Sequence, residues 1–127
     1  MNIIKIDEVP NKPLGGAPMH IGKVMTQVLV SDSKDNFIDT VTFSKGARNR
    51  LHTHPVDQVM IVTDGQGIVA TDKEERMVSE GDVILIPAGE KHWHGATEDS
   101  DFSHLFVLRK DLLGEHRATI VEESSGD

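Results

Sequence analysis

Two histidines separated by one residue are the first feature of this sequence that could do chemistry. The segment LHTHPVDQ, residues 51–58, contains His52 and His54 and then Gln58. Side chains alternate in direction along a β-strand, so both imidazoles would point to one face, with Cα atoms about 6.6 Å apart. Imidazoles in that arrangement can bind one metal ion. The alternative is a solvated polar turn at Pro55 that carries two histidines.

A second pair with the same spacing follows an apolar segment and a Pro-Ala-Gly turn. In GDVILIPAGEKHWHG, residues 81–95, the pair is His92 and His94. The chain contains no cysteine, so a transition metal must be bound by imidazole, carboxylate, amide or water. The two pairs together favour a histidine metal site over two unrelated turns.

Short β segments must position these residues. Segments rich in β-branched residues alternate with turn sequences, and no strong helical pattern separates them. The segments are KVMTQVLV, FIDTVTF, QVMIVTD, GIVAT, RMV, DVILIP and FSHLFVLR. This pattern predicts an all-β sandwich or barrel, with hairpin loops at DGQG (residues 64–67) and DKEE (residues 72–75). A weak helix candidate is KDLLGEH, residues 110–116, and EESSGD at residues 122–127 has the composition of a disordered tail.

Strand alternation identifies two further side chains that would point inward. Asp39 shares a strand face with Val41 and Phe43, so it enters the barrel if they do. A carboxylate there must be paired or near a cation, which makes Asp39 a candidate proton carrier or a partner of a metal ligand; a strand-end aspartate at the solvated mouth is the alternative. By the same alternation, His104 lies inward between Phe102 and Phe106.

Length and charge narrow the possible partners. A chain of 127 residues corresponds to one domain, and a net charge of −8 opposes binding to nucleic acid. The N-terminus MNIIKIDEVP lacks the apolar region of a signal peptide, and no segment approaches the roughly 20 apolar residues that span a bilayer. We therefore expect a cytoplasmic protein without a membrane or nucleic-acid partner that acts on a small molecule.

The framework around the histidines resembles the two motifs of the cupin superfamily, because turn residues and histidines fall at that family's intervals. The matching positions are Gly46, His52, His54, Gln58, Gly65, Gly81, Pro87, Gly89 and His92. The resemblance covers about residues 46–96 and implies a cupin double-sheet jelly-roll barrel around a metal site. On this basis residues 1–127 form a single cupin domain, with an N-terminal arm and linker (1–18), the barrel (19–110) and a C-terminal extension and tail (111–127).

Within that superfamily, the phrases GARNRLHTHP, QVMIVTDGQG and KHWHGAT are most similar to small cupins that include manganese-dependent bacterial hydroxynitrile lyases. The resemblance implies that the metal ligands are His52, His54, Gln58 and His92. It also implies that His94 and His104 transfer protons or stabilise an anion. Ala96 departs from the pattern, since an asparagine often ends the second motif.

Gln58 stands where most cupins have glutamate. Three neutral imidazoles and a neutral amide leave the charge of a divalent ion uncompensated, so the ion is a stronger Lewis acid and Fe(II) is harder to oxidise. Alternatively, the glutamine is a tolerated ligand without functional meaning. Four N/O ligands fit a six-coordinate ion, and we expect Mn(II), with Fe(II), Ni(II) or Zn(II) as alternatives.

Three functions follow from these residues and the resemblance. The first is a redox-neutral lyase with the metal as Lewis acid. The second is an Fe-dependent dioxygenase, and the third is a cupin that only binds a metal or small ligand. His20 and His116 match no motif and receive no role.

The resemblance further implies a homodimer. The segment NIIKID, residues 2–7, is strand-like and precedes the linker NKPLGGAP, residues 11–18, which could let it cross to a second subunit.

Overall fold

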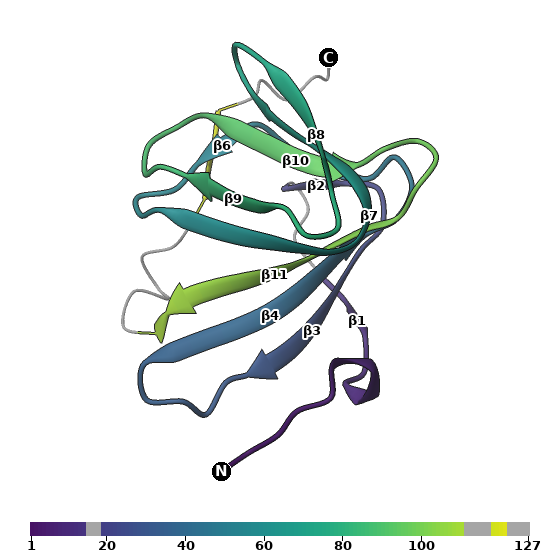
Figure 1. Cartoon of the computed structure of the whole chain (residues 1–127). Coiled ribbons are helices and arrows are strands. Elements are labelled where there is room, and N and C mark those ends of the chain that lie inside the picture. Colours follow the sequence, from purple (N-terminus) through teal and green to yellow (C-terminus); the bar gives the residue numbers. More distant parts are fainter. Residues whose placement is uncertain (15–18, 111–117, 122–127) are drawn as a thin grey trace.

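The structure, a computed structural model, describes residues 1–14, 19–110 and 118–121, and its regular elements are almost all strands (Figure 1). The elements are η1 (Ile6–Glu8, a 3-10 turn), β1 (Lys12–Pro13), β2 (His20–Ile21), β3 (Val24–Val30), β4 (Asn36–Phe43), β5 (Arg48–Asn49), β6 (His52–Thr53), β7 (Gln58–Thr71), β8 (Glu75–Ser79), β9 (Val83–Ile86), β10 (His92–Ala96), β11 (Phe102–Arg109) and β12 (Thr119–Ile120). The all-β prediction is confirmed. The candidate helix and the candidate disordered tail fall almost wholly outside the described residues.

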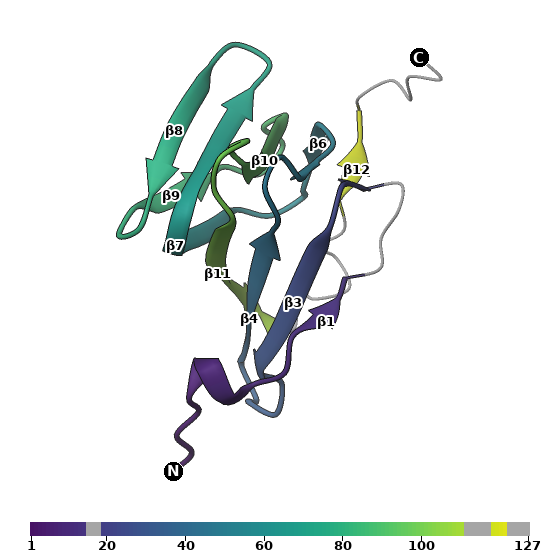
Figure 2. The ribbon, with the colours of Figure 1, turned by 90° about the vertical axis from the view of Figure 1, so that its right-hand side faces the viewer.

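The strands form one curled, antiparallel sheet with the order β1-β3-β4-β11-β7-β10-β5-β2. One half contains β3, β4, β11 and the first part of β7, with β9 paired to β7. The other half contains the last part of β7 with β8, β10, β5 and β6. Figures 1 and 2 show the two halves folding toward each other around β7. The inward side chains of both halves therefore share one interior.

The expected hairpin at DGQG is wrong, because β7 runs through this segment from one half of the sheet to the other. Its pairing with β11 shifts register between Ser103 and His104, which marks a bulge. Gly65 has φ +76°, and a Cβ there would lie 1.8 Å from the Asp101 carbonyl oxygen. A Cβ on Gly67 would lie 2.6 Å from the Phe102 ring. Gly65 and Gly67 therefore let β7 continue as one bent strand that passes close to the start of β11. The second expected loop, DKEE, does connect β7 to β8.

Strand alternation places the core as predicted. Phe43 and Phe102 are fully buried, and their rings stack with centroids 6.2 Å apart. Val24, Val41 and Val62 complete the centre of this cluster. These residues come from β3, β4, β7 and β11, so the apolar cluster fills the interior near the bend of β7. Two of its members, Val41 and Phe43, also line the internal cavity.

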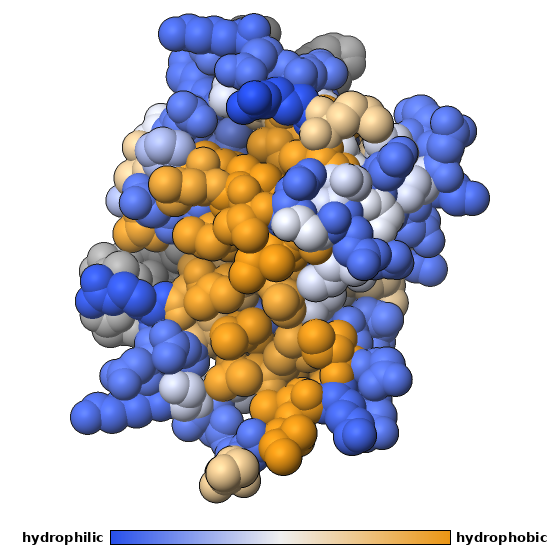
Figure 3. Space-filling model, viewed as in Figure 1, coloured by the Kyte–Doolittle hydropathy of each residue, from blue (hydrophilic) through white to orange (hydrophobic). Residues whose placement is uncertain are grey.

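The opposite face of the same strands is also apolar. Figure 3 shows a broad hydrophobic surface over β9, β7, β11 and β4. Val83 and Leu85 of β9 are 66% and 61% exposed, and Val107 of β11 is 38% exposed. In this structure that surface is exposed to solvent.

The N-terminal arm differs from expectation. Part of the expected strand, at residues 2–7, is instead the 3-10 turn η1, and part of the expected linker is β1, which pairs with β3. The buried Gln27 side chain fixes the turn by donating to the carbonyl oxygens of Ile6 (2.7 Å) and Val9 (2.8 Å). These side-chain bonds hold the arm against β3. Among the described residues, no helix is long and apolar enough to cross a membrane.

Candidate metal centre

Three histidines meet where β6 and β10 pair. His52 on β6 is directly opposite His92 on β10, and His54 follows β6. One potential ligand nitrogen from each ring lies within 4.8 Å of the other two. The ring centroids of His52 and His92 are 4.3 Å apart, and His52 and His92 are each only 1% exposed. The paired spacing thus brings both motifs to one point, as the sequence predicts.

Backbone carbonyls fix the orientation of two of these rings. Nδ1–H of His92 donates to the Glu90 carbonyl oxygen (2.9 Å), and Nδ1–H of His52 donates to that of Arg50. A neutral imidazole that donates through Nδ1 has a lone pair on Nε2. Metal-binding histidines are commonly held in this way. Both rings therefore present a metal-binding nitrogen to the cluster.

Gln58 supplies a test of whether the residues fit a cation. It begins β7, is 2% exposed, and its Oε1 lies 3.2 Å from His92 Nε2. Because the His92 proton is on Nδ1, the lone pair of His92 Nε2 faces a lone pair of Gln58 Oε1. A cation bound between them would satisfy both, so the four residues predicted as ligands fit a divalent ion. The donors are all neutral nitrogen or oxygen, as Mn(II), Fe(II), Ni(II) and Zn(II) accept.

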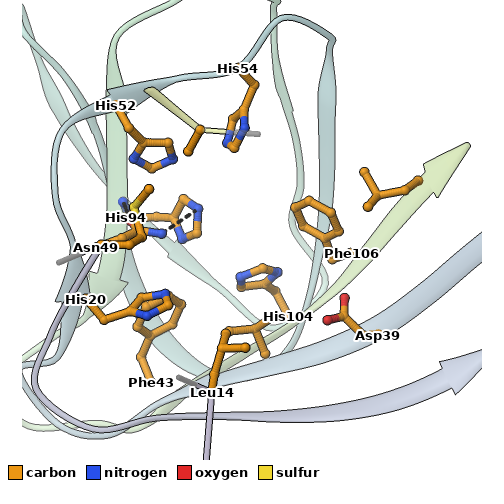
Figure 4. Close-up of a pocket in the computed structure, with 14 residues that line it drawn as sticks. Leu14, His20, Asp39, Phe43, Asn49, His52, His54, His94, His104 and Phe106 are labelled. Atoms are coloured by element: carbon orange, nitrogen blue, oxygen red, sulfur yellow. Dashed lines mark hydrogen bonds between the residues drawn. The ribbon is translucent and has the colours of Figure 1, made fainter. Parts of the chain in front are cut away.

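A cavity of about 300 Å³ extends from this cluster into the barrel. His52 and His54 lie at one end of it, and His94, His104 and Phe43 lie further in (Figure 4). Strands from both halves of the sheet line the cavity. This volume is at the lower end of the range for small-molecule sites.

His94 is held by Asn49, a residue to which sequence analysis gave no role. The backbone N–H of His94 donates to Asn49 Oδ1 (2.9 Å), which orients the amide so that Nδ2 donates to His94 Nε2 (3.4 Å). The proton of the neutral His94 ring is then on Nδ1, which is buried and has no hydrogen-bond partner. Burial, and then the neighbouring histidines, hold the pKa of His94 well below its usual value. His94 thus offers an unused N–H donor.

His104 offers the complementary group. Its Nδ1–H donates to the Leu105 carbonyl oxygen (3.3 Å), so the lone pair is on Nε2, which is buried without a partner. Burial lowers the pKa of His104 to about 4, so the ring is neutral at pH 7. Its centroid lies 5.2 Å from that of His94 and 6.1 Å from that of Phe43. A ring with an unused acceptor therefore neighbours a ring with an unused donor, and the predicted inward position of His104 is confirmed.

Asp39 is at another end of the cavity, close to Phe106 (Figure 4). Its inward direction is as predicted, but in the described part of the chain no hydrogen bond joins it to a histidine. Oδ2 accepts a hydrogen bond from the Thr26 hydroxyl (3.1 Å), and Oδ1 is buried without a partner. Burial raises the pKa of Asp39 to about 6, although the Thr26 bond opposes this. A proton-carrying role for Asp39 remains a prediction.

Sequence analysis missed two cavity residues on short strands. His20 of β2 pairs in register with Asn49 of β5, and both line the cavity. Each strand has two residues, too few for alternation to be recognised from sequence. Trp93, between the two histidines of β10, lies outside the cavity lining and stacks under the Arg48 guanidinium, 4.4 Å from the ring centroid.

Comparison with known proteins gives one family match and two similar proteins of known activity. A family model described as cupin domain matches residues 39–108. An (R)-mandelonitrile lyase of Granulicella tundricola is 45% identical over 74 residues, 56% of this chain and 55% of that protein. An acireductone dioxygenase of a Sulfurihydrogenibium species is 33% identical over 64 residues, 47% of this chain and 36% of that protein. The matches therefore span about half or less of these relatives.

Solved structures share the fold over most of the chain. A cupin-like protein of Thermotoga maritima is 30% identical, with a TM-score of 0.74, and the match covers 85% of this chain and 83% of that one. A polyketide cyclase of Streptomyces resistomycificus has a TM-score of 0.81 at 16% identity, with 98% and 88% covered. The second similarity concerns the fold alone.

We predict that one divalent ion requires the residues of this cluster. His52→Ala and His92→Ala should each lose most bound metal, because each removes one donor; affinity losses of about tenfold or more are expected. His20→Ala is the matched control and should keep the parent's metal content, since His20 lines the cavity outside the cluster. Mass spectrometry after reconstitution with Mn(II) measures the content. Unchanged occupancy in both cluster variants would contradict the assignment.

A second prediction concerns the cost of the Asp39 charge. The pKa of Asp39 is about 6 in the fold, against 3.8 for an aspartate in water, so the folded state holds the proton more tightly than the unfolded chain does. The free energy of unfolding therefore falls as pH rises between these two values. Asp39→Asn removes the charge and should be more stable than the parent at pH 7.5 by about 2 kcal/mol, after discounting for partial exposure.

At pH 5 the advantage of Asp39→Asn should shrink to roughly half. Urea unfolding at the two pH values measures this. Asp32→Asn removes an equally charged but exposed side chain and should show no such difference. An Asp39→Asn variant no more stable than the parent at pH 7.5 would show that the carboxylate is not destabilising.

Proposed function

This chain belongs to the cupin family, and from that premise we propose that it is a metal-dependent enzyme, a redox-neutral lyase that cleaves a small cyanohydrin or related hydroxy compound. One observation carries the proposal: the unused Nδ1–H of His94 and the unused Nε2 of His104 lie beside the histidine cluster in one cavity. The 45% identity to a mandelonitrile lyase supports the choice of substrate.

The residues suggest how the reaction would proceed. An ion held by His52, His54, His92 and Gln58 would act as a Lewis acid toward the substrate's oxygen. His104 Nε2 then accepts the hydroxyl proton as the carbon–carbon bond breaks and the carbonyl forms. The electron pair of that bond leaves with cyanide, which His94 Nδ1–H stabilises by a hydrogen bond. His104 returns its proton to cyanide, so hydrogen cyanide and an aldehyde are released.

The environment suits these roles. Because its pKa is near 4, His104 is neutral at pH 7 and its lone pair is available. His104 is a weak base, so it can accept the substrate's hydroxyl proton only if that hydroxyl has been made more acidic. A bound ion would do this, and it would do so more strongly because the neutral Gln58 does not cancel any of its charge. Phe43 packs against both rings, with centroids 5.5 Å from His94 and 6.1 Å from His104. The pair is therefore held in a fixed, water-poor position.

The test is cleavage of mandelonitrile under nitrogen by manganese-loaded protein, followed as benzaldehyde release. His94→Ala and His104→Ala should retain metal and lose about 10²- to 10⁴-fold in rate, the usual range for acid–base help. His52→Ala should lose both metal and activity. His20→Ala, which removes a cavity histidine with neither role, should retain both.

Three outcomes would change the assignment. Parent-like rates in His94→Ala and His104→Ala would remove the pair from the mechanism. The similarity to an acireductone dioxygenase makes an Fe-dependent dioxygenase the second candidate, and turnover only with Fe(II) and O₂ would favour it. Binding without turnover under any condition would indicate a cupin that only holds a metal or ligand.

We also propose that the protein forms a homodimer through its N-terminal arm. Ile3 and Ile4 are 82% and 43% exposed, and residues of the broad apolar face of Figure 3, such as Val83 and Leu85, are exposed as well. A second copy that receives these isoleucines would remove them from water, and each fully buried side chain contributes about 1.5–3 kcal/mol.

Deletion of residues 1–9 should convert the dimer to a monomer, as measured by size-exclusion chromatography with light scattering. The deletion also removes the carbonyl partners of Gln27. The double variant Ile3→Ser, Ile4→Ser keeps those partners and should weaken the dimer similarly. A monomeric parent, or a dimer unaffected by both changes, would contradict the proposal.

A further inference from the structure

The carboxyl group of Asp39 lies in an otherwise apolar part of the cavity, apart from the histidine cluster. It projects inward from β4 on the face it shares with Val41 and Phe43. In Figure 4 its carboxyl group lies beside Phe106, on the far side of His104 from the metal cluster. The cavity therefore has a cation-binding end and, apart from it, a carboxylate.

Only one of the two carboxylate oxygens of Asp39 accepts a hydrogen bond from the described residues. Thr26 on β3 donates to Oδ2, and this bond fixes the group's direction. Oδ1 is buried and accepts no hydrogen bond. A buried charged acceptor without a partner costs several kcal/mol, and buried charges are ordinarily paired. The fold tolerates an acceptor here that it does not use.

No group around Asp39 neutralises it in the described part of the chain. In register, Asp39 lies beside Val28 of β3 and Phe106 of β11. His104, two residues along β11, is the titratable group nearest in the strand, and it is neutral at pH 7. The position is thus an unpaired acceptor within an aromatic and aliphatic wall.

We propose that Asp39 is a substrate-recognition subsite that binds a cationic amine carried by the substrate at the end away from its metal-binding oxygen. This rests on the proposed function, since it assumes that the same cavity holds the substrate. A cation that donates hydrogen bonds supplies both the missing partner of Oδ1 and the missing charge. Charge-assisted bonds of this kind are about twice as strong as neutral ones. An alcohol supplies only the bond, and a carboxylate would be repelled.

The size and lining of the cavity define the rest of the ligand. A volume of about 300 Å³ suits a molecule of one ring. The cavity lining is otherwise largely apolar and includes Phe43, Val41, Phe106 and Leu108. The inferred substrate class is therefore a small aromatic hydroxy compound that carries an alkylamine side chain.

The test compares the binding of benzylamine, benzyl alcohol and benzoate by calorimetry. The parent should bind benzylamine at least about tenfold more tightly than benzyl alcohol, a difference of about 1.4 kcal/mol, and benzoate most weakly. Asp39→Asn should reduce the amine preference to within about twofold. Asp32→Asn is the matched control for the loss of one negative charge and should keep the preference.

Each measurement is made with manganese-loaded parent and with His52→Ala, which is expected to lack metal. An amine preference that persists in His52→Ala and disappears in Asp39→Asn supports the subsite even if the lyase proposal fails. Benzylamine bound no more tightly than benzyl alcohol by the parent overturns the inference. So does a preference that survives in Asp39→Asn, since the amine would then be held elsewhere.

Discussion

The hydrogen bond that fixes the protonated nitrogen of each buried histidine ring is the constraint on which the site depends. His52, His92 and His104 donate from Nδ1 to backbone carbonyls, and His94 accepts from the Asn49 amide. Each bond determines which nitrogen carries the proton, and so what the other nitrogen presents to the cavity. Three rings present lone pairs and one presents an N–H. Whether each of these chemically identical side chains offers a lone pair or an N–H to the cavity thus depends on its backbone or amide partner.

Much of this arrangement could be predicted from sequence where strands are long. Alternation along β4 and β11 correctly placed Asp39 and His104 inside, and the two paired motifs converge as their spacing predicts. Prediction failed where local sequence and tertiary context disagree. DGQG has the composition of a tight turn, but pairing with β8, β10 and β11 keeps it in β7, where its glycines relieve clashes with Asp101 and Phe102. Asn49 and His20 were missed because strands of two residues have no recognisable period.

The interior also contains polar groups whose burial reduces the stability of the fold. A barrel of this size could fill its centre with aliphatic side chains, yet this one contains four fully buried or nearly buried imidazoles and an inward carboxylate. Burial disfavours the charged form of each, which lowers the pKa of His94 and His104 and raises that of Asp39. Phe43 and Phe102 compensate in part, since they pack beneath the polar layer and keep it in place. The polar groups that line the cavity are thus also groups that weaken the fold.

The passage of β7 through both halves of the sheet has a consequence for how the protein opens. Its first part pairs with β9 and β11 and its last part with β8 and β10, so four neighbours depend on one strand. Because β7 is a strand of both halves, displacing it would remove a paired strand from each of them. The two halves therefore form one cooperative unit rather than two that fluctuate separately, and sub-global opening is confined to the strand pairs at the periphery. A molecule that entered the cavity would therefore pass such peripheral segments, because a hinge-like parting of the barrel would disrupt the pairing of β7.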